Sequence, residues 1–264
     1  VIYTAHVFHF FTGAPKKNWL IYYPVEKLLS RVTDSLLLIN REDYERARQH
    51  FYARHTDLLP GVGIDIAAVQ RGAAAGRELR EELGIPAEQQ ILLTAGEMIP
   101  RKNQKLLLEV LKRLGNPRIT LIILGHGKLE EALRAQTREL GLTAQVMFPG
   151  YRTDVFRFYG IADLFLFPSL QEGLPVAVME AMAAGVPVVA SAVRGNRDLI
   201  LPGQGGELLP PHDAAAWEKI VSILLRDCKK REAFGLYNKT RVSAFSREAN
   251  ETKMREIYAR YDKA

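Results

Sequence analysis

Two glutamates separated by seven residues, Glu172 and Glu180, are the side chains of this sequence best suited to chemistry. Glu180 lies on an apolar segment of valine, alanine and methionine that is typical of a helix entered from a strand. Burying a carboxylate without a partner costs free energy or shifts its pKa, so Glu180 needs a partner in the protein or in a polar ligand. The pattern therefore predicts one side of a ligand site. The alternative is that Glu172 caps the helix and Glu180 pairs within the protein.

Cations that could face these carboxylates follow an earlier predicted strand. Residues 96–103 place Arg101 and Lys102 at the expected start of a helix, where positive side chains add to a terminus that already favours anions. A pair of solvated surface cations is an equally good interpretation of these two residues alone.

Two further loops are candidates for ligand contacts. Residues 124–128 contain Gly125 and Gly127, which indicate a structural turn more readily than a ligand loop. The third glycine of the dinucleotide fingerprint is missing, and no Gly-Lys-Ser/Thr phosphate loop occurs, which argues against an NAD enzyme or a P-loop ATPase. In residues 150–154, Tyr151 is suited to meet a base, and Asp154 is suited to cap the next helix.

The elements that must position these loops alternate between short apolar runs and amphipathic stretches. Runs of about four to six apolar residues suit strands that are buried on both faces of a parallel sheet. They fall at residues 36–39, 91–95, 119–124, 146–148, 164–167 and 187–190. Helical patterns lie between them, which predicts a doubly wound α/β fold. In such sheets ligands bind beyond the carboxyl ends of the strands, where all four loops lie.

The distribution of strands predicts three parts of the chain. Residues 1–65 supply about three strands, too few for a self-sufficient doubly wound domain, and we expect them to form a partial amino-terminal, acceptor-side domain. Residues 66–235 supply about six strands and are expected to bind the donor. Residues 236–264 are expected to form a helix that docks back, with Met254 and Ile257 on its apolar face.

Composition narrows the class of protein without choosing a function. The 264 residues carry a net charge of +6, which favours anionic partners, and the single Cys228 suits a reducing compartment. No apolar run approaches the roughly 20 residues that span a bilayer. His6 and His9 lack the further ligands of a metal site, and no nucleic-acid module is recognisable. Residues 19–23, preceded by two lysines, indicate a buried helix covering the sheet or, less readily, a membrane-surface helix.

The joint pattern resembles a known family. The two glutamates, followed by Ala-Met-Ala-Ala-Gly-Val-Pro at residues 181–187, are similar to the signature of retaining, nucleotide-sugar-dependent glycosyltransferases of family 4, which have the GT-B fold. The resemblance covers essentially the whole chain. Six segments resemble in particular the exopolysaccharide and capsule branch of this family, namely residues 3–10, 13–15, 26–30, 39–44, 60–65 and 195–200. The fold expected from it is a complete donor domain plus a partial amino-terminal Rossmann-like domain.

The resemblance also implies roles for individual residues. Glu180 would accept hydrogen bonds from ribose hydroxyls, Glu172 would contact the donor sugar near the reacting carbon, and His6 would face that sugar from the amino-terminal domain. Lys102, assisted by Arg101, would lie beside the leaving diphosphate, where these enzymes generally use cationic side chains and no metal. Sugar hydroxyls and phosphate would be held by the backbone around Gly173, Leu174 and Pro175.

Some positions depart from the family pattern. Glu97 follows Gly96 where many members carry arginine, and Val7 stands where glycine is usual after the histidine. The chain opens with Val1 in the middle of an apparent strand. The resemblance therefore leads us to expect that an amino-terminal portion on the order of a hundred residues is missing.

Two hypotheses follow for the function. The first is a truncated glycosyltransferase that transfers a sugar from a UDP-sugar to a lipid-linked or glycan acceptor with retention of configuration. It would be cytoplasmic, with peripheral contact at the inner face of the membrane. The second is a non-catalytic nucleotide-sugar-binding or structural module. In either case we expect a homodimer or a repacked remnant, because about three strands leave apolar faces or an edge uncovered.

Overall fold

The computed structural model describes residues 1–262, which form two parallel β-sheets with helices packed against them. The smaller sheet has the order β1-β2-β3 and the larger one the order β6-β5-β4-β7-β8-β9. The strands are β1 Ile2–Ala5, β2 Ser35–Leu38, β3 His55–Leu58, β4 Gln90–Ala95, β5 Ile119–Leu124, β6 Val146–Gly150, β7 Leu164–Phe167, β8 Val188–Ser191 and β9 Gly206–Leu209. The predicted α/β class and the strand numbers of three and six are confirmed.

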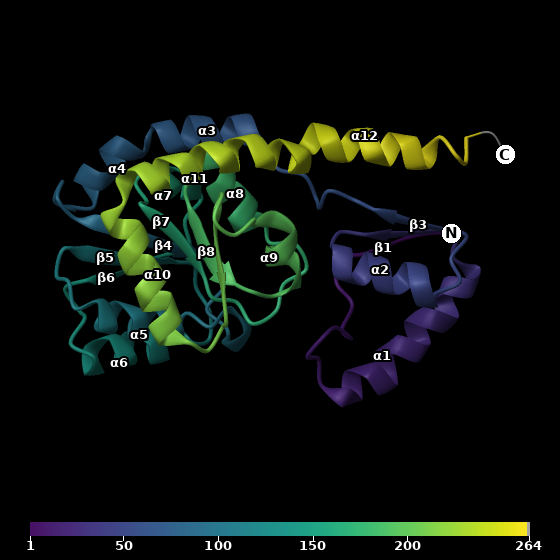
Figure 1. Cartoon of the computed structure of the whole chain (residues 1–264), viewed down its shortest axis with the longest axis horizontal. Coiled ribbons are helices and arrows are strands. Elements are labelled where there is room, and N and C mark those ends of the chain that lie inside the picture. The colour runs from purple at the N-terminus through teal and green to yellow at the C-terminus, as the bar shows by residue number, and fades with distance from the viewer. Residues whose placement is uncertain (263–264) are drawn as a thin grey trace.

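Helices connect consecutive strands and cover the sheets (Figure 1). They are α1 Lys16–Leu29, α2 Arg41–His50, α3 Ile66–Ala74, α4 Gly76–Glu82, α5 Lys105–Leu114, α6 Glu130–Glu139, α7 Val155–Tyr159, α8 Val176–Ala184, α9 Arg194–Leu199, α10 Ala214–Arg226, α11 Cys228–Arg241 and α12 Arg247–Tyr258. Three short 3₁₀ turns occur at Ser30–Val32, Pro100–Lys102 and Val242–Phe245. The ends of α5 and α8 are set by Gly115 and Gly185 in the left-handed conformation.

The larger sheet is buried on both faces, which explains its continuous apolar runs. Ile91 and Leu93 of β4 belong to one hydrophobic cluster, whereas Leu92 between them belongs to another. This division follows from the two-residue period of a strand, which sends neighbouring side chains to opposite faces. The first cluster includes residues of α3, α7 and α8, and the second includes residues of α5 and α10. Two layers of helices therefore hold the central strands rigidly.

The smaller sheet, with α1 and α2, forms a separate layer that we call the smaller unit; the six-stranded sheet and its helices are the larger unit (Figure 1). A hydrophobic cluster joins α1 to the smaller sheet, since Trp19 and Tyr23 pack against the cluster that contains Phe10 after β1 and Leu36 of β2. The prediction of a buried helix at residues 19–23 is only partly right, because α1 has no fully buried residue. One face of the helix covers the sheet. The other exposes six large apolar side chains, namely Leu20, Ile21, Tyr22, Val25, Leu28 and Leu29.

The carboxyl-terminal helix α12 returns from the larger unit to the smaller one (Figure 1). Ile257 on this helix is fully buried. Just beyond it, Arg260 forms two hydrogen bonds with the carboxylate of Asp57 in β3, at 2.7 and 2.8 Å. The expected boundary at residue 235 falls inside α11, and α12 follows the turn Val242–Phe245. Among residues 1–262, no helix combines the length and the apolar character needed to cross a bilayer.

Candidate functional site

The strand order of the larger sheet creates a crevice between two loops. Strand β4 lies between β5 and β7. The chain adds β5 and β6 on one side of β4, and then adds β7, β8 and β9 on the other side. Ligands of open α/β sheets bind at such a switch point, outside the carboxyl ends of the strands. The loop after β4 carries Arg101 and Lys102, and the loop after β7 carries Glu172. The topology therefore brings the predicted cations and the first glutamate to the same crevice.

Glu172 is the centre of a charged cluster in this crevice. Its side chain is 8% exposed, and Oε1 accepts hydrogen bonds from Lys102 Nζ at 2.7 Å and Arg101 Nη1 at 3.2 Å. Ser169, which is fully buried, donates to the same oxygen. A desolvated carboxylate is retained only where charge and hydrogen bonds replace its water, and these three donors do so. Glu172 is thus paired within the protein and does not cap α8, which has no side-chain cap.

Lys102 is held over the crevice by more than its ion pair. Its ammonium lies 4.7 Å from the ring centroid of Phe167 at the end of β7. Its aliphatic part runs past Gly96, where a Cβ atom would lie 3.6 Å from Lys102 Cε. The prediction that Arg101 and Lys102 start a helix is wrong in detail. They lie in the 3₁₀ turn Pro100–Lys102, which Asn103 ends in a left-handed conformation before α5.

Glu180 lies on α8 and has a neutral partner. The hydroxyl of Tyr159, a buried residue of α7, donates to Glu180 Oε2 at 3.1 Å. Burial raises the pKa of Glu180, an effect that this hydrogen bond only partly offsets. Burial and the Glu180 carboxylate together raise the pKa of Tyr159 well above its usual value, so the phenol remains a donor. Among residues 1–262, Glu180 forms no salt bridge, and the hydroxyl of Tyr159 is its side-chain hydrogen-bond partner.

A pocket of about 450 Å³ lies beyond the ends of β4, β5 and β6. Tyr151 and His126 line it with their rings 5.8 Å apart in an edge-to-face arrangement. Tyr151 is 71% exposed, so its ring is available to a planar ligand. Gly96 and Val155 also line the pocket. Gly96 lies beside the side chain of Lys102, and Val155 is the first residue of α7, the helix that carries Tyr159. Sequence reasoning missed His126, although it lies between the two glycines that were noted.

Gly125 and Gly127 are required by close packing of the backbone. A Cβ atom at Gly125 would lie 2.2 Å from the carbonyl oxygen of Gly96, and one at Gly127 would lie 2.6 Å from that of Met98. These glycines let the loops after β4 and β5 touch, as the structural interpretation predicted. Asp154 does not cap α7 as predicted, because Arg152 holds both of its oxygens at 2.8 Å.

The remaining predicted residues meet where the two units touch. Helix α8 begins at Val176, so Gly173, Leu174 and Pro175 form its entry. The backbone of His6 lies against this entry, since a Cβ atom at Gly173 would be 2.6 Å from the carbonyl oxygen of His6. His6 itself is exposed. The structure therefore places His6 beside the entry of α8, whereas Tyr151 lies in the pocket beyond β4, β5 and β6.

Two further observations concern metal-ligating groups and the size of cavities. Within residues 1–262, no group of three or more His, Cys, Asp or Glu side chains could hold a metal ion. A larger cavity of about 860 Å³ lies at the junction of the two units. It includes only Leu174 of the predicted site residues, so volume alone does not locate the chemistry.

Comparison with known proteins identifies the family of the chain. The family described as Glycosyl transferases group 1 matches residues 76–241, more than half of the chain. EpsD of Bacillus subtilis (strain 168), which carries the name of a glycosyltransferase, is 36% identical over 99% of this chain and 70% of its own length. An Escherichia coli alpha-1,3-galactosyltransferase is 24% identical over 88% of this chain. The chain belongs to the glycosyl transferases group 1 family.

Solved structures show the same fold. HepE of Anabaena, crystallised with UDP, superposes with a TM-score of 0.88 at 22% identity, covering 98% of this chain and 71% of HepE. Sucrose-phosphate synthase of Thermosynechococcus elongatus superposes with a TM-score of 0.83 at 24% identity, covering 98% of this chain and 67% of that protein. The fold is thus GT-B-like, as predicted. The chain spans 64% of the length of the E. coli relative and 60% of a D-inositol 3-phosphate glycosyltransferase of Xylanimonas cellulosilytica, to which it is 28% identical over 90% of its own length.

The raised pKa of Glu180 predicts that its charge destabilises the free protein. An acid with a raised folded-state pKa weakens the fold above that pKa, and the effect vanishes once both states are protonated. We expect Glu180→Gln to raise the Tm at pH 8, with a gain that shrinks as the pH falls to about 4, near the unfolded-state pKa of glutamate. Thermal unfolding across this range measures it. The exposed Glu88, changed to Gln, should give no such gain, and a lower Tm for Glu180→Gln at pH 8 would contradict the prediction.

Proposed function

We propose that the chain binds a UDP-sugar and serves in transfer of the sugar, with retention of configuration, to a lipid-linked or glycan acceptor. The observation that carries the proposal is the crevice between β4 and β7, where Lys102 and Arg101 meet Glu172 and where the pocket of Tyr151 opens. HepE was crystallised with UDP-glucose, and the name of the E. coli relative gives UDP-Gal as its donor. These relatives support a uridine nucleotide as the ligand of this crevice.

The crevice offers a separate contact to each part of such a donor. The base would stack against Tyr151, and the ribose hydroxyls would donate to Glu180, the carboxylate that lacks a cation. Lys102 and Arg101 would oppose the diphosphate, whose charge grows as the bond to the sugar breaks. Groups fixed before the reaction stabilise such charge without reorganising. We therefore assign these cations the role that a metal ion fills in other transferases, with no metal required.

The sugar would lie between the two units. Glu172 would contact it near the reacting carbon, and the backbone around Gly173 would hold its hydroxyls together with phosphate. His6 would face it from the smaller unit, since its backbone already touches Gly173. The acceptor would then attack from the face that the diphosphate leaves. The amino-terminal residues 1–65 would form the acceptor side and residues 66–235 the donor side.

Calorimetric titration with UDP, in the presence of EDTA, tests donor binding directly. We expect the chain to bind UDP, and we expect Glu180→Ala to weaken binding about tenfold or more, because hydrogen bonds to a charged group contribute about 1.5–3 kcal/mol. Glu88→Ala is the matched control and should bind like the unchanged chain. No heat of binding to UDP would overturn the proposal.

A non-catalytic module is the second candidate. The engagement of both cations with Glu172 favours it, because a cluster already neutralised in part can bind a donor without driving its cleavage. Release of UDP from UDP-glucose or UDP-galactose, with and without glycan acceptors, separates the two candidates. Release decides for the enzyme. Binding without release, for every donor and acceptor tried, decides for the module.

Lys102 should act on the diphosphate and not on the nucleoside. We expect Lys102→Met to weaken UDP binding about 10- to 100-fold and uridine monophosphate binding much less, because the second phosphate is the one that lies beside the ammonium in our proposal. Lys105→Met, which removes an exposed lysine at the start of α5, controls for net charge. Equal losses for both nucleotides would contradict this assignment. The titrations used for UDP serve here as well.

The exposed face of α1 supports the proposed peripheral contact with a membrane. Leu28 is 62% exposed and Leu20 is 78% exposed, and Lys16 and Lys17 precede them on the same helix. Apolar side chains with flanking lysines suit the boundary of an anionic bilayer. We expect the chain to sediment with vesicles containing anionic lipid, and Leu20→Gln combined with Leu28→Gln to reduce this at least fivefold. Leu236→Gln on α11 is the control. Dimerisation through this face, measured by light scattering without vesicle binding, would contradict the membrane contact in favour of the expected homodimer.

A further inference from the structure

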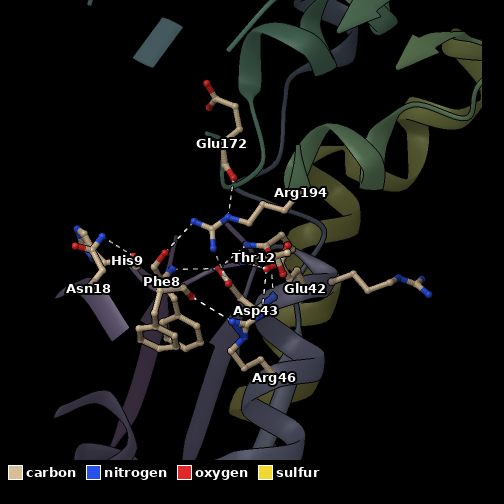
Figure 2. A network of polar contacts seen from close by, with 12 residues as sticks. Phe8, His9, Thr12, Asn18, Glu42, Asp43, Arg46, Glu172 and Arg194 are labelled. Atoms are coloured by element: carbon tan, nitrogen blue, oxygen red, sulfur yellow. Dashed lines mark hydrogen bonds and ion pairs between the residues drawn. The ribbon is translucent and has the colours of Figure 1, made fainter. Parts of the chain in front are cut away.

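A buried arginine that sequence reasoning did not identify as a site residue joins three segments beside the proposed sugar site. Arg194, the first residue of α9, donates from Nη1 to Asp43 Oδ1 at 2.7 Å, from Nη2 to the carbonyl of Phe8 at 2.9 Å, and from Nε to the carbonyl of Glu172 at 3.0 Å. Figure 2 shows these bonds converging on one guanidinium, with the carboxylate of Glu172 pointing away from it. Its planar face also lies 4.5 Å from the ring centroid of Phe11.

The ion pair of Arg194 and Asp43 is almost completely dry. The two side chains are 2% and 0% exposed. The second oxygen of Asp43 accepts from the amide of Phe8 at 3.1 Å and from Asn40 Nδ2 at 2.8 Å, so the carboxylate is fully bonded. A dry ion pair stabilises a fold little better than apolar residues of the same size. Its distinctive property is geometry, because the fork of an arginine fixes three acceptors at set directions.

The backbones at this junction touch one another directly. A Cβ atom at Gly195 would lie 2.0 Å from the carbonyl oxygen of Gly173, and one at Gly173 would lie 2.6 Å from that of His6. Both glycines are therefore required by space. The loop of His6, the loop of Glu172 and the start of α9 form a stack, and Arg194 bonds to the first two.

We infer that Arg194 and Asp43 are positioning residues for the donor sugar. Lys102 and Arg101 hold the carboxylate of Glu172, and Arg194 holds its carbonyl, so the residue is fixed at both ends. The same arginine fixes the carbonyl of Phe8, two residues from His6. The pair thereby sets the distance between the two walls of the proposed sugar site. This inference rests on the proposed function, in which Glu172 and His6 face the sugar.

A purely structural tie between the units is the competing explanation. The units have other contacts that do not involve Arg194. The amide of Arg41 donates to Asp198 Oδ2 at 2.8 Å, and Arg260 binds Asp57. Loss of the arginine fork alone should therefore leave the two units together. What it should change is the order of the two loops that the fork holds.

The variant that isolates the fork is Arg194→Lys. A lysine keeps a cation beside Asp43, but its single ammonium cannot reach three acceptors in the directions that the fork covers. We expect UDP affinity to change less than twofold, and the affinity for UDP-glucose relative to UDP to fall about tenfold. We also expect amide hydrogen exchange in the unliganded chain to rise at least fivefold over residues 6–10 and 170–175. Arg197→Lys is the matched control, because Arg197 is an exposed arginine on the same helix whose side chain donates to the carbonyl of Ala192.

The outcomes separate the inference from the proposed function. Unchanged relative affinity together with unchanged exchange would overturn the positioning role. Equal losses for UDP and UDP-glucose, with exchange raised throughout the chain, would show a structural role and overturn it as well. If Arg194→Lys does not fold, the double variant Arg194→Met with Asp43→Asn removes both charges and should show the same selective loss. Failure of the unchanged chain to bind UDP would overturn the proposed function itself, and the inference with it.

Discussion

The negative charge of Glu172 is the constraint around which the site is arranged. With 8% of its side chain exposed, this carboxylate has lost most of its water, and a carboxylate in that position is stable only if donors replace the water. The donors come from Lys102 and Arg101 after β4 and from Ser169 after β7. Arg194 after β8 binds the carbonyl of the same residue. Three loops that are distant in sequence are therefore tied to one another through one glutamate.

The sheet could be predicted from the sequence because its strands are buried on both faces. β5, for example, consists entirely of buried residues from Ile119 to Leu124, and such a run is visible without any knowledge of its neighbours. β9 was not located individually, because it starts with Gly206 and its other residues are only half-buried. The expectation for α1 was only partly right for a related reason. Its apolar residues surround the helix, and periodicity cannot say which of them a small sheet will cover.

The site could be predicted to the level of its loops but not of its contacts. The spacing of Glu172 and Glu180 and the strand ends around them located the crevice, since carboxyl ends of parallel strands share one edge. Nothing local shows that Lys102 meets Glu172 across 70 residues of sequence. The cap predicted for Asp154 competes with a charged partner two residues away, Arg152, which takes both of its oxygens. Arg194 gave no signal because its three acceptors belong to other segments.

The two glutamates of the motif have partners of different charge, and this difference suits the chemistry of the proposed donor. Glu172 is paired with cations, and because Lys102 and Arg101 together carry one charge more than Glu172 removes, the cluster keeps a net positive charge for a diphosphate. Glu180 has only the neutral phenol of Tyr159 and would repel a phosphate, whereas ribose hydroxyls can donate to it without bringing a charge. In the proposed complex, the ring of Tyr151, the carboxylate of Glu180 and the cations beside Glu172 would meet the base, the ribose and the diphosphate in that order. In that proposal the sugar would lie at the junction that Arg194 holds.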